Sequence, residues 1–600
     1  MSIHEEDVLG KAYDARLMRR LITYLRPYKL QVALATAAII GHSILELAPP
    51  YLVKLVIDRY IPARDINGLS IVAMLYLATL AGSFVLDYAQ TWVLQFTGQR
   101  IMFDIRMQIY EHLQQLDVRF YDRNPVGRLM TRVTTDVDVL NDLFTSGVVS
   151  VFGDLFTLVG IMAMMVWLDW RLAIVAFSVL PLIWIVTQWF RRNVRESYRT
   201  VRIWIARINA YLQERITGMA TVQLFRREAR DFDEFEQIDR TYRNANVQSI
   251  FYYAVFYPAI ELISALAAAL IIWVGGGWVL GGVLTLGSLV ASLQYSSRFF
   301  RPISDMSEKF NILQGAMASS ERIFQLLDTP VEITSRSGAG SRPSTGSGRK
   351  IGRIAFENVT FAYIPGESVV RNVSFTVDPG QRVAIVGATG SGKTTIVSLL
   401  LRFYDAQEGR ITIGGIDIRD MDLHELRSLF GLVLQDVHLF SGTIGGNVRL
   451  GNEAIDDGAV RRAVEAVHAS GFIDRLPAGL DTPVAERGAT LSVGQKQLLS
   501  FARALAFDPP VLVLDEATSS VDTETELLIR DALKVVMRGR TTIAIAHRLS
   551  TIQDMDRILV LHKGELREAG THQELLAHRG IYHRLYQLQF KDRELVGRAL

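Results

Sequence analysis

The chain of 600 residues changes its hydrophobic pattern between residues 312 and 350. Long apolar runs recur before that stretch, and short apolar runs alternate with amphipathic ones after it. A membrane-spanning helix needs about 20 mainly apolar residues to cross about 30 Å of hydrocarbon. Six segments meet this requirement: Leu30–Val56, Leu69–Gly98, Leu143–Leu168, Leu172–Phe190, Ala254–Leu280 and Val283–Phe300.

Basic residues near the ends of these segments predict their orientation. Six arginines lie between Arg100 and Arg132, and twelve lie between Arg191 and Arg243. The opposite connections hold only Arg59, Arg64 and Arg171. Both termini and both long loops are therefore predicted to be cytoplasmic. The N-terminal residues lack the apolar core of a cleaved signal peptide, so the first span is expected in the mature protein.

The two cytoplasmic connections are long and patterned like helices throughout. Long structureless loops are unusual in compact proteins, which favours helices that continue past the bilayer. Short transverse elements are expected at the tips, near Asp117–Asn124 and near Leu212–Val222. Phe120 and Tyr121 lie at the first tip, where a merely solvated helix would not need aromatic side chains.

Ionisable residues inside spans are costly and mark functional or partnered positions. An i,i+4 ion pair is predicted between Lys54 and Asp58. Glu46 and Glu261 have no such local partner, so either a cationic substrate or a hydrogen bond between helices is expected there. The Pro49-Pro50 pair predicts a kink in the first span. The full set of ionisable span residues is Glu46, Lys54, Asp87, Asp154 and Glu261.

Residues Asp328–Lys350 are rich in Ser, Gly, Arg and Pro, which predicts a flexible tether between two folded units. Beyond it, the apolar runs RVAIV, VLVLD, TTIAIA and RILVL predict a parallel sheet buried on both faces.

Directly after the predicted strand Arg382–Val386 comes the sequence GATGSGKT, from Gly387 to Thr394. This is the phosphate-binding pattern G-x-x-x-x-G-K-[ST] in its strand–loop–helix context. Backbone N–H groups of such a loop surround phosphate oxygens at a helix N-terminus. Lys393 is expected to neutralise the β- and γ-phosphates, and the Thr394 hydroxyl to bind Mg²⁺.

A second strand ends at Asp515 and is followed at once by Glu516. Asp515 can hold Mg²⁺, and Glu516 is placed to polarise an attacking water. A kinase keeps water away from the γ-phosphate, so this arrangement favours hydrolysis. The net charge of +2 and the absence of a separate basic tract argue against a nucleic-acid partner. With no cysteine, the chain has no disulfide or thiolate metal site.

The stretch LSVGQ, Leu491–Gln495, resembles the signature of ATP-binding cassette (ABC) transporters. FAY ending at Tyr363 resembles their adenine-stacking loop, and Gln435 their Q-loop. AERG at Ala485–Gly488, SSVD ending at Asp522 and AHR around His547 are similar to the X-loop, D-loop and switch histidine. Phe120–Asp138 is similar to the first intracellular loop of the exporter branch. Six spans before one cassette also match that branch.

The resemblance implies an α-helical six-span transmembrane domain followed by an α/β P-loop nucleotide-binding domain. The expected divisions are a cytoplasmic segment at 1–29, the transmembrane domain at 30–327, the linker at 328–350 and the nucleotide-binding domain at 351–600.

The resemblance also assigns roles to individual residues, with ATP and Mg²⁺ as ligands. The catalytic residues would be Glu516, His547, Lys393 and Gln435. ATP would contact Tyr363, Gly387, Ala388, Thr389, Gly390, Ser391, Gly392, Lys393, Thr394, Thr395, Gln435, Asp515 and His547. Mg²⁺ would be bound by Thr394, Gln435 and Asp515. Coupling to the membrane half would involve Phe120, Tyr121, Glu486, Arg487 and Asp522. The signature residues Leu491, Ser492, Val493, Gly494 and Gln495 would complete the site of another chain.

That last assignment implies a second half-transporter. Val493 stands where the commonest signature has Gly, while Ser492 and Gly494 keep the usual residues. The variant favours a heterodimer in which this chain is the hydrolytically intact member. A homodimer with a tolerated variant is the alternative. Ala485 replaces the usual X-loop Gly, with no consequence predicted.

The function expected from the resemblance is ATP-driven export of amphipathic or hydrophobic compounds, drugs or lipids, from the cytoplasm or inner leaflet. A lipid flippase and an exporter-shaped importer of a metal chelate are the alternatives. An ATP-gated regulator is disfavoured, because that role would not require the intact hydrolytic residues. A bacterial cell membrane with a cytoplasmic nucleotide-binding domain is the expected location.

Overall fold

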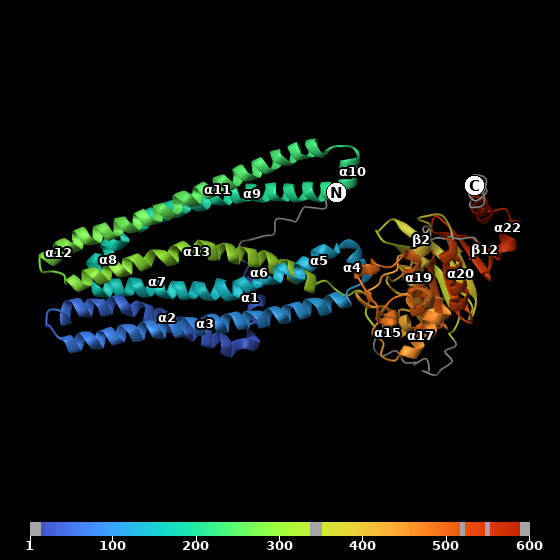
Figure 1. The fold of residues 1–600 in the computed structure, drawn as a ribbon, viewed down its shortest axis with the longest axis horizontal. Coiled ribbons are helices and arrows are strands. Elements are labelled where there is room, and N and C mark those ends of the chain that lie inside the picture. Colours follow the sequence, from blue (N-terminus) through green and yellow to red (C-terminus); the bar gives the residue numbers. More distant parts are fainter. Residues whose placement is uncertain (1–13, 336–350, 517–522, 547–551, 589–600) are drawn as a thin grey trace. The chain divides into compact units, whose positions relative to one another are not determined.

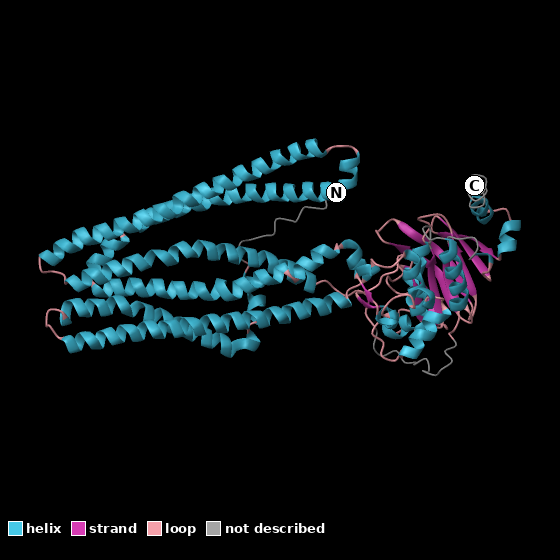
Figure 2. Cartoon of the chain, in the orientation of Figure 1, coloured by secondary structure: helices cyan, strands magenta, loops and turns pink. Residues whose placement is uncertain are grey.

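The structure, a computed structural model, describes residues 14–335, 351–516, 523–546 and 552–588. The chain divides into two compact units. The first comprises Met1–Gln114 with Val126–Thr329, and the second comprises Gln115–Pro125 with Pro330–Leu600. Helices make up the first unit, and strands with covering helices make up most of the second (Figure 2).

Long helices form the first unit (Figure 1). The 50-residue α3 is about 75 Å long at 1.5 Å per residue, more than twice the thickness of a bilayer core. This element is therefore long enough for the predicted extension of helices beyond the membrane. The α-helices of the first unit are α1 (Ala15–Thr23), α2 (Lys29–Leu55), α3 (Ile66–Gln115), α5 (Val126–Val133), α6 (Thr135–Asp142), α7 (Val148–Leu168), α8 (Trp170–Phe177), α9 (Leu180–Thr217), α10 (Met219–Leu224), α11 (Glu228–Leu270), α12 (Gly276–Leu280) and α13 (Leu286–Leu327).

Within the described part of the chain, five helical stretches are long and apolar enough to cross a membrane. They are Arg26–Tyr60, Ile66–Gln115, Val151–Leu168, Trp170–Thr217 and Glu228–Leu280. Four of them contain one whole predicted span, and Val151–Leu168 covers the C-terminal part of the predicted span Leu143–Leu168. The sixth predicted span, Val283–Phe300, lies in the 42-residue α13 from Leu286 onward.

Local breaks in these helices differ from the sequence expectation. The fourth span is interrupted between α8 and α9, where Pro181 occupies the first turn of α9, a position that tolerates the missing N–H. In contrast, α2 continues through Pro49 and Pro50. The second transverse element is short: residues 212–217 still belong to α9, and the turn is made by α10.

The ionisable residues of the spans have partners that the sequence did not indicate. The predicted pair between Lys54 and Asp58 is wrong. Asp58 instead accepts hydrogen bonds from Thr285 Oγ1 (2.6 Å) and from the Gly287 backbone N–H (2.7 Å), which ties the end of the first span to the start of α13. Asp154 forms an ion pair with Lys309 of α13. Glu46 does have a local neighbour, since its carboxylate lies 3.9 Å from His42 Nε2.

A buried carboxylate joins α6 to the cytoplasmic part of α13. Asp136 is 7% exposed. Its carboxylate accepts hydrogen bonds from Arg322 Nε (3.0 Å) and Ser319 Oγ (2.9 Å). Because two of its partners lie on α13, this residue fixes the packing of α6 against that helix.

The second unit is built on a six-stranded sheet of order β12-β11-β3-β10-β9-β6, with β12 antiparallel to its neighbour (Figure 1). A four-stranded antiparallel sheet of order β2-β1-β4-β5 accompanies it. The strands are β1 (Ile354–Ala362), β2 (Ser368–Val377), β3 (Arg382–Val386), β4 (Glu408–Ile413), β5 (Ile416–Asp417), β6 (Phe430–Val433), β7 (Gly442–Thr443), β8 (Pro483–Val484), β9 (Val511–Glu516), β10 (Thr541–Ala546), β11 (Arg557–His562) and β12 (Glu565–Gly570). The described helices are α4 (Val118–Arg123), α14 (Lys393–Leu400), α15 (Leu423–Ser428), α16 (Ile444–Arg449), α17 (Asp457–Ala466), α18 (Ser470–Ile473), α19 (Val493–Ala506), α20 (Thr523–Met537) and α22 (His572–Ala577).

Side chains of the six-stranded sheet alternate between two separate cores. Val383 and Ile385 of β3 pack into the core that contains α14 and the antiparallel sheet. Ala384 and Val386 of the same strand pack into the core that contains α17, α19 and α20. The sheet is thus buried on both faces, as the continuous apolar runs predicted. It also places α14 and α19 on opposite faces.

The beginning of the predicted tether is held by contacts within the second unit. The Asp117 carboxylate accepts from the backbone N–H groups of Glu332 and Ile333, both at 3.1 Å. Ser335 Oγ donates to Asp422 (2.5 Å) and accepts from the Leu423 N–H (3.0 Å). Residues 332–335 therefore bridge α4 and the N-terminus of α15. The remaining tether, 336–350, lies outside the described residues.

Replacement of Asp136 tests the packing of α6 on α13. Asp136→Ala leaves Arg322 without its carboxylate in a partly buried place, and loss of one partner of a buried pair costs about 3–5 kcal/mol. We expect a clear fall in the melting midpoint of the purified protein. Asp138 lies on α6 as well, and Asp138→Ala removes an exposed ion pair with Arg106 of α3, which should cost less than about 1 kcal/mol. Equal melting midpoints for the two variants would contradict this account.

Candidate nucleotide-binding and coupling site

One edge of the six-stranded sheet gathers the predicted nucleotide residues. Strands β3, β10, β9 and β6 are neighbours and parallel. Ile385 pairs with Ile545, and Ile545 pairs with Asp515. The carboxyl ends of parallel strands meet at one edge, so the P-loop after β3, Asp515 at the end of β9 and Gln435 just after β6 come together there. Glu516 ends β9 and its side chain is not among those described; His547, next after β10, lies outside the described residues.

The P-loop has the backbone conformation that its glycines permit. Gly392 caps α14 with φ 97°, in the left-handed region, and Gly390 has φ 78°. At Gly387 there is no space for a side chain, because a Cβ there would lie 2.3 Å from the Leu561 carbonyl oxygen. Ser391 Oγ is buried and has no hydrogen-bond partner among the described residues. A buried hydroxyl of this kind is suited to a ligand oxygen.

Lys393 places a buried cation inside this loop. Lys393 is 6% exposed, and its Nζ donates to the carbonyl oxygens of Gly387 (2.8 Å) and Ala388 (3.1 Å). Burial lowers the pKa of the Lys393 ammonium below its ordinary value, against the opposing effect of the Asp515 carboxylate. A buried positive charge is stabilised by a neighbouring anion, so the loop is electrostatically suited to phosphate.

Tyr363 lies beside the first turns of α14. Its hydroxyl donates to Thr395 Oγ1 at 3.2 Å, and Thr395 itself is buried. The preceding residue, Ala362, is held by the side chain of Gln407. The Ala362 N–H donates to Gln407 Oε1 (2.9 Å), and Gln407 Nε2 donates to the Ala362 carbonyl (3.0 Å). A half-buried aromatic ring held next to the P-loop helix suits stacking with a nucleobase.

Thr394, Gln435 and Asp515 supply only oxygen donors for a metal. Thr394 and Gln435 are exposed, and Asp515 is partly buried. Among the residues that the structure describes, no group of three or more His, Cys, Asp or Glu side chains could hold an ion. Mg²⁺ is bound by one or two carboxylates together with substrate phosphates and water, so this sparse set of hard donors fits it.

The signature begins α19 on the opposite face of the sheet from α14. Ser492 and Gln495 form a reciprocal capping box: the Gln495 N–H donates to Ser492 Oγ (3.2 Å), and the Ser492 N–H donates to Gln495 Oε1 (2.9 Å). Leu498, Leu499 and Phe501 bury α19 in its own core. Val493 is 55% exposed at the first position of the helix.

Comparison with known proteins agrees with both units. Residues 32–303 match the family described as the ABC transporter transmembrane region, and residues 370–519 match the family described as ABC transporter. An uncharacterized ABC transporter ATP-binding protein, YknV of Bacillus subtilis, is 38% identical over 98% of this chain and 96% of its own length. The chain belongs to the ABC transporter family.

Two further relatives carry more specific names. A probable multidrug resistance ABC transporter ATP-binding/permease protein of Bacillus subtilis, YheH, is 40% identical over 88% of this chain and 77% of its own length. An ATP-dependent lipid A-core flippase of Syntrophus aciditrophicus is 35% identical over 96% of this chain and 95% of its own length. Family membership confirms a multi-pass membrane protein that couples ATP hydrolysis to transport.

In this ABC transporter the X-loop contacts the start of the signature helix. Glu486–Gly488 form a short 3-10 turn in which Arg487 has φ 55°. Lys496 Nζ of α19 donates to the Arg487 carbonyl at 3.0 Å. The Glu486 and Arg487 side chains are exposed and available to another element. Asp522 of the D-loop lies outside the described residues.

The first transverse element, α4, belongs to the same compact unit as the nucleotide-binding domain. Phe120 and Tyr121 lie on it with their rings perpendicular and 5.6 Å apart. Two contacts of this element were missed by sequence reasoning: Asp117 binds the linker, and Asp122 accepts a hydrogen bond from Tyr404. Tyr404 lies in an irregular segment between α14 and β4, where no periodicity or motif marks it.

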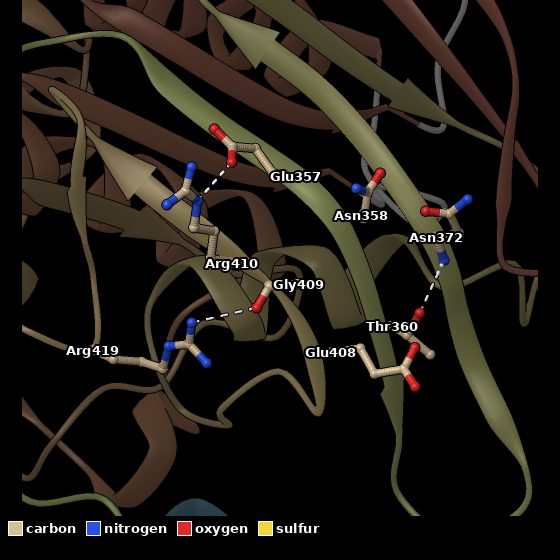
Figure 3. Close-up of a pocket in the computed structure, with 8 residues that line it drawn as sticks. All are labelled: Glu357, Asn358, Thr360, Asn372, Glu408, Gly409, Arg410 and Arg419. Atoms are coloured by element: carbon tan, nitrogen blue, oxygen red, sulfur yellow. Dashed lines mark hydrogen bonds and ion pairs between the residues drawn. The ribbon is translucent and has the colours of Figure 1, made fainter.

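A polar hollow of about 460 Å³ lies elsewhere in the unit, on β1, β2 and β4 (Figure 3). Two of its charged groups have partners within it: Arg410 pairs with Glu357 at 2.6 Å, and Arg419 donates to the Gly409 carbonyl at 3.3 Å. None of the predicted site residues lines it. The hollow is therefore separate from the nucleotide edge.

Substitution in the P-loop tests its geometry. Gly387→Ala forces a Cβ against the Leu561 carbonyl and displaces the loop, so ATP affinity should fall by about tenfold or more. Binding of a fluorescent ATP analogue measures this loss. Gly471→Ala, where a Cβ meets nothing within 4 Å, serves as the matched control. Unchanged affinity in Gly387→Ala would contradict the placement of phosphate in this loop.

Proposed function

We propose that this ABC transporter is one half of an exporter that moves amphipathic drugs or lipids out of the cytoplasmic leaflet, using two ATP sites shared between two chains. The observation that carries the proposal is the placement of α14 and α19 in separate cores on opposite faces of one sheet. A nucleotide held at the P-loop edge then needs α19 from a second chain. The names of the multidrug and lipid flippase relatives support the substrate class.

Each composite site would use complementary residues of the two chains. One chain supplies Tyr363 for the base, residues Gly387–Thr395 for the phosphates, and Lys393 for their charge. The other chain supplies Ser492, Gly494 and the first N–H groups of α19, with Leu491, Val493 and Gln495 alongside. Gln495 acts indirectly, because its side chain holds the Ser492 N–H in the capping box. The N-terminus of a 14-residue helix favours the negative charge of a γ-phosphate.

Hydrolysis follows from groups at the sheet edge. Glu516 accepts a proton from the attacking water, and His547 and Gln435 contact the γ-phosphate region. Lys393 balances charge on the phosphate oxygens as the bond to the leaving ADP breaks. Thr394, Gln435 and Asp515 would hold Mg²⁺, which would supply further stabilisation of the negative charge on the phosphates. Separation of ADP and phosphate removes the contacts that hold the two chains together.

The partner would also receive the second transverse element. Leu224 at the end of α10 is 76% exposed and Phe225 beside it is 68% exposed. An apolar tip of this kind suits a groove on another chain. On the nucleotide-binding domain, Leu434 and Phe440 around the Q-loop are exposed as well and offer an apolar surface of the same kind.

A heterodimer is favoured over a homodimer, because Val493 departs from the usual glycine at an exposed position beside the predicted γ-phosphate contact. The cytoplasmic location of the nucleotide-binding domain in a bacterial cell membrane follows from the arginine-rich loops. Lipid flipping and uptake of a metal chelate remain alternatives that use the same machinery and differ in substrate.

Glu516→Gln tests the proposed general base. The amide cannot accept the proton, so the ATPase rate of the protein in lipid nanodiscs should fall by about 10²- to 10⁴-fold, while ATP binding persists. Glu465→Gln, an exposed glutamate on α17, is the matched control and should leave the rate unchanged. A Glu516→Gln protein with near-normal ATPase activity would overturn the assignment.

A further inference from the structure

Tyr404 lies between the proposed adenine platform and the transverse helix α4. The residue is 8% exposed. Its ring is perpendicular to that of Tyr363, with centroids 5.2 Å apart, and lies 5.4 Å from that of Phe361. The rings of Phe361 and Tyr363 also meet edge to face at 4.9 Å. The three rings therefore pack as one cluster, in which a shift of Tyr363 displaces Tyr404.

The hydroxyl of Tyr404 reaches out of this cluster to α4. It donates a hydrogen bond to the carboxylate of Asp122. Burial, followed by the hydrogen bond to Asp122, raises the pKa of Tyr404, so the phenol stays protonated and remains a donor at physiological pH. Hydrogen bonds to a carboxylate are stronger than those between neutral groups, so this bond links the ring cluster firmly to α4.

The other end of α4 is attached differently. Asp117 accepts the two backbone N–H groups of the linker, and Arg119 pairs with Glu332 at 3.2 Å with both side chains well exposed. These contacts join α4 to the linker, and Ser335 of the linker in turn binds the N-terminus of α15. None of these hydrogen bonds and ion pairs involves Phe361, Tyr363 or Tyr404. The orientation of α4 thus depends on two attachments, one to the linker and one to Tyr404. The second lies beside the ring of Tyr363, the proposed adenine platform.

We propose that Tyr404 is a positioning residue that transmits occupancy of the adenine platform to α4, with its ring resting on Tyr363 and its hydroxyl holding Asp122. This rests on the proposed function, because it takes Tyr363 as the base-stacking residue. A base stacked on Tyr363 would fix the ring cluster, and close packing would pass that restraint to Tyr404. The transmitted signal would therefore report the nucleobase rather than the phosphates alone.

Hydrogen exchange in the Glu516→Gln background tests this directly, using full-length protein in lipid nanodiscs. Adding ATP should slow exchange both in the P-loop, 387–395, and in α4. Tyr404→Phe keeps the ring and removes the hydroxyl, so ATP should still protect the P-loop but no longer α4. Saturating tripolyphosphate, which has no base, should protect the P-loop of the parent protein and leave α4 unprotected.

The matched control is Tyr582→Phe, which removes a buried hydroxyl bonded to His572 Nδ1 (2.6 Å) elsewhere in the same unit. It should leave the α4 response intact. In a background with intact Glu516, Tyr404→Phe should keep basal ATPase activity and the KM for ATP, and reduce substrate-stimulated transport by about tenfold. Asp122→Asn, whose amide oxygen still accepts, should retain more transport than Asp122→Ala.

ATP-dependent protection of α4 that survives in Tyr404→Phe would overturn the proposal, as would equal protection of α4 by tripolyphosphate and ATP. A uniform fall in melting midpoint and basal ATPase, without the selective loss at α4, would assign Tyr404 a purely structural role and also overturn it. Failure of the proposed function gives a different result: ATP would then protect neither the P-loop nor α4 in the parent protein.

Discussion

The six-stranded sheet sets the constraint on which the rest of the molecule depends. Its alternating side chains create two cores, and each core buries a different helix whose N-terminus suits an anion. Since α14 and α19 lie on opposite faces, one chain cannot bring both to the same phosphates. Under the proposed function, the need for a second chain is therefore a consequence of strand geometry.

Attachment of α4 to the nucleotide-binding domain follows from polar contacts at both of its ends. Asp117 accepts hydrogen bonds from backbone N–H groups at the start of the linker, and Ser335 Oγ then bonds to Asp422 and to the Leu423 N–H at the N-terminus of α15. Asp122 meets a tyrosine whose ring belongs to the hydrophobic core. In the proposed coupling, rigid packing on one side and an exposed ion pair on the other would let α4 respond to changes at Tyr363 while it stays attached.

Periodicity and the glycine-rich motif predicted the long helices, the doubly buried parallel sheet and the P-loop, because each depends on local sequence. The hydrogen bonds of Asp58 and the ion pair of Asp154 with Lys309 were missed or misassigned, because they depend on residues distant in sequence. The break before Pro181 was missed although the proline marks it locally. Composition predicted that residues 332–335 belong to a flexible tether. Hydrogen bonds of their backbone N–H groups hold them in place, and composition does not reveal such bonds. The roles of Glu516, Asp522 and His547 stay predictions.

The central claim is that one chain alone cannot complete an ATP site, and size-resolved ATPase measurement tests it most directly. The solubilised protein is separated into monomeric and dimeric fractions, and hydrolysis is measured in each per chain. The account predicts that monomers bind ATP through the P-loop but hydrolyse it negligibly, whether the active dimer contains two copies or a different partner. Monomers that hydrolyse ATP as fast per chain as dimers would contradict it.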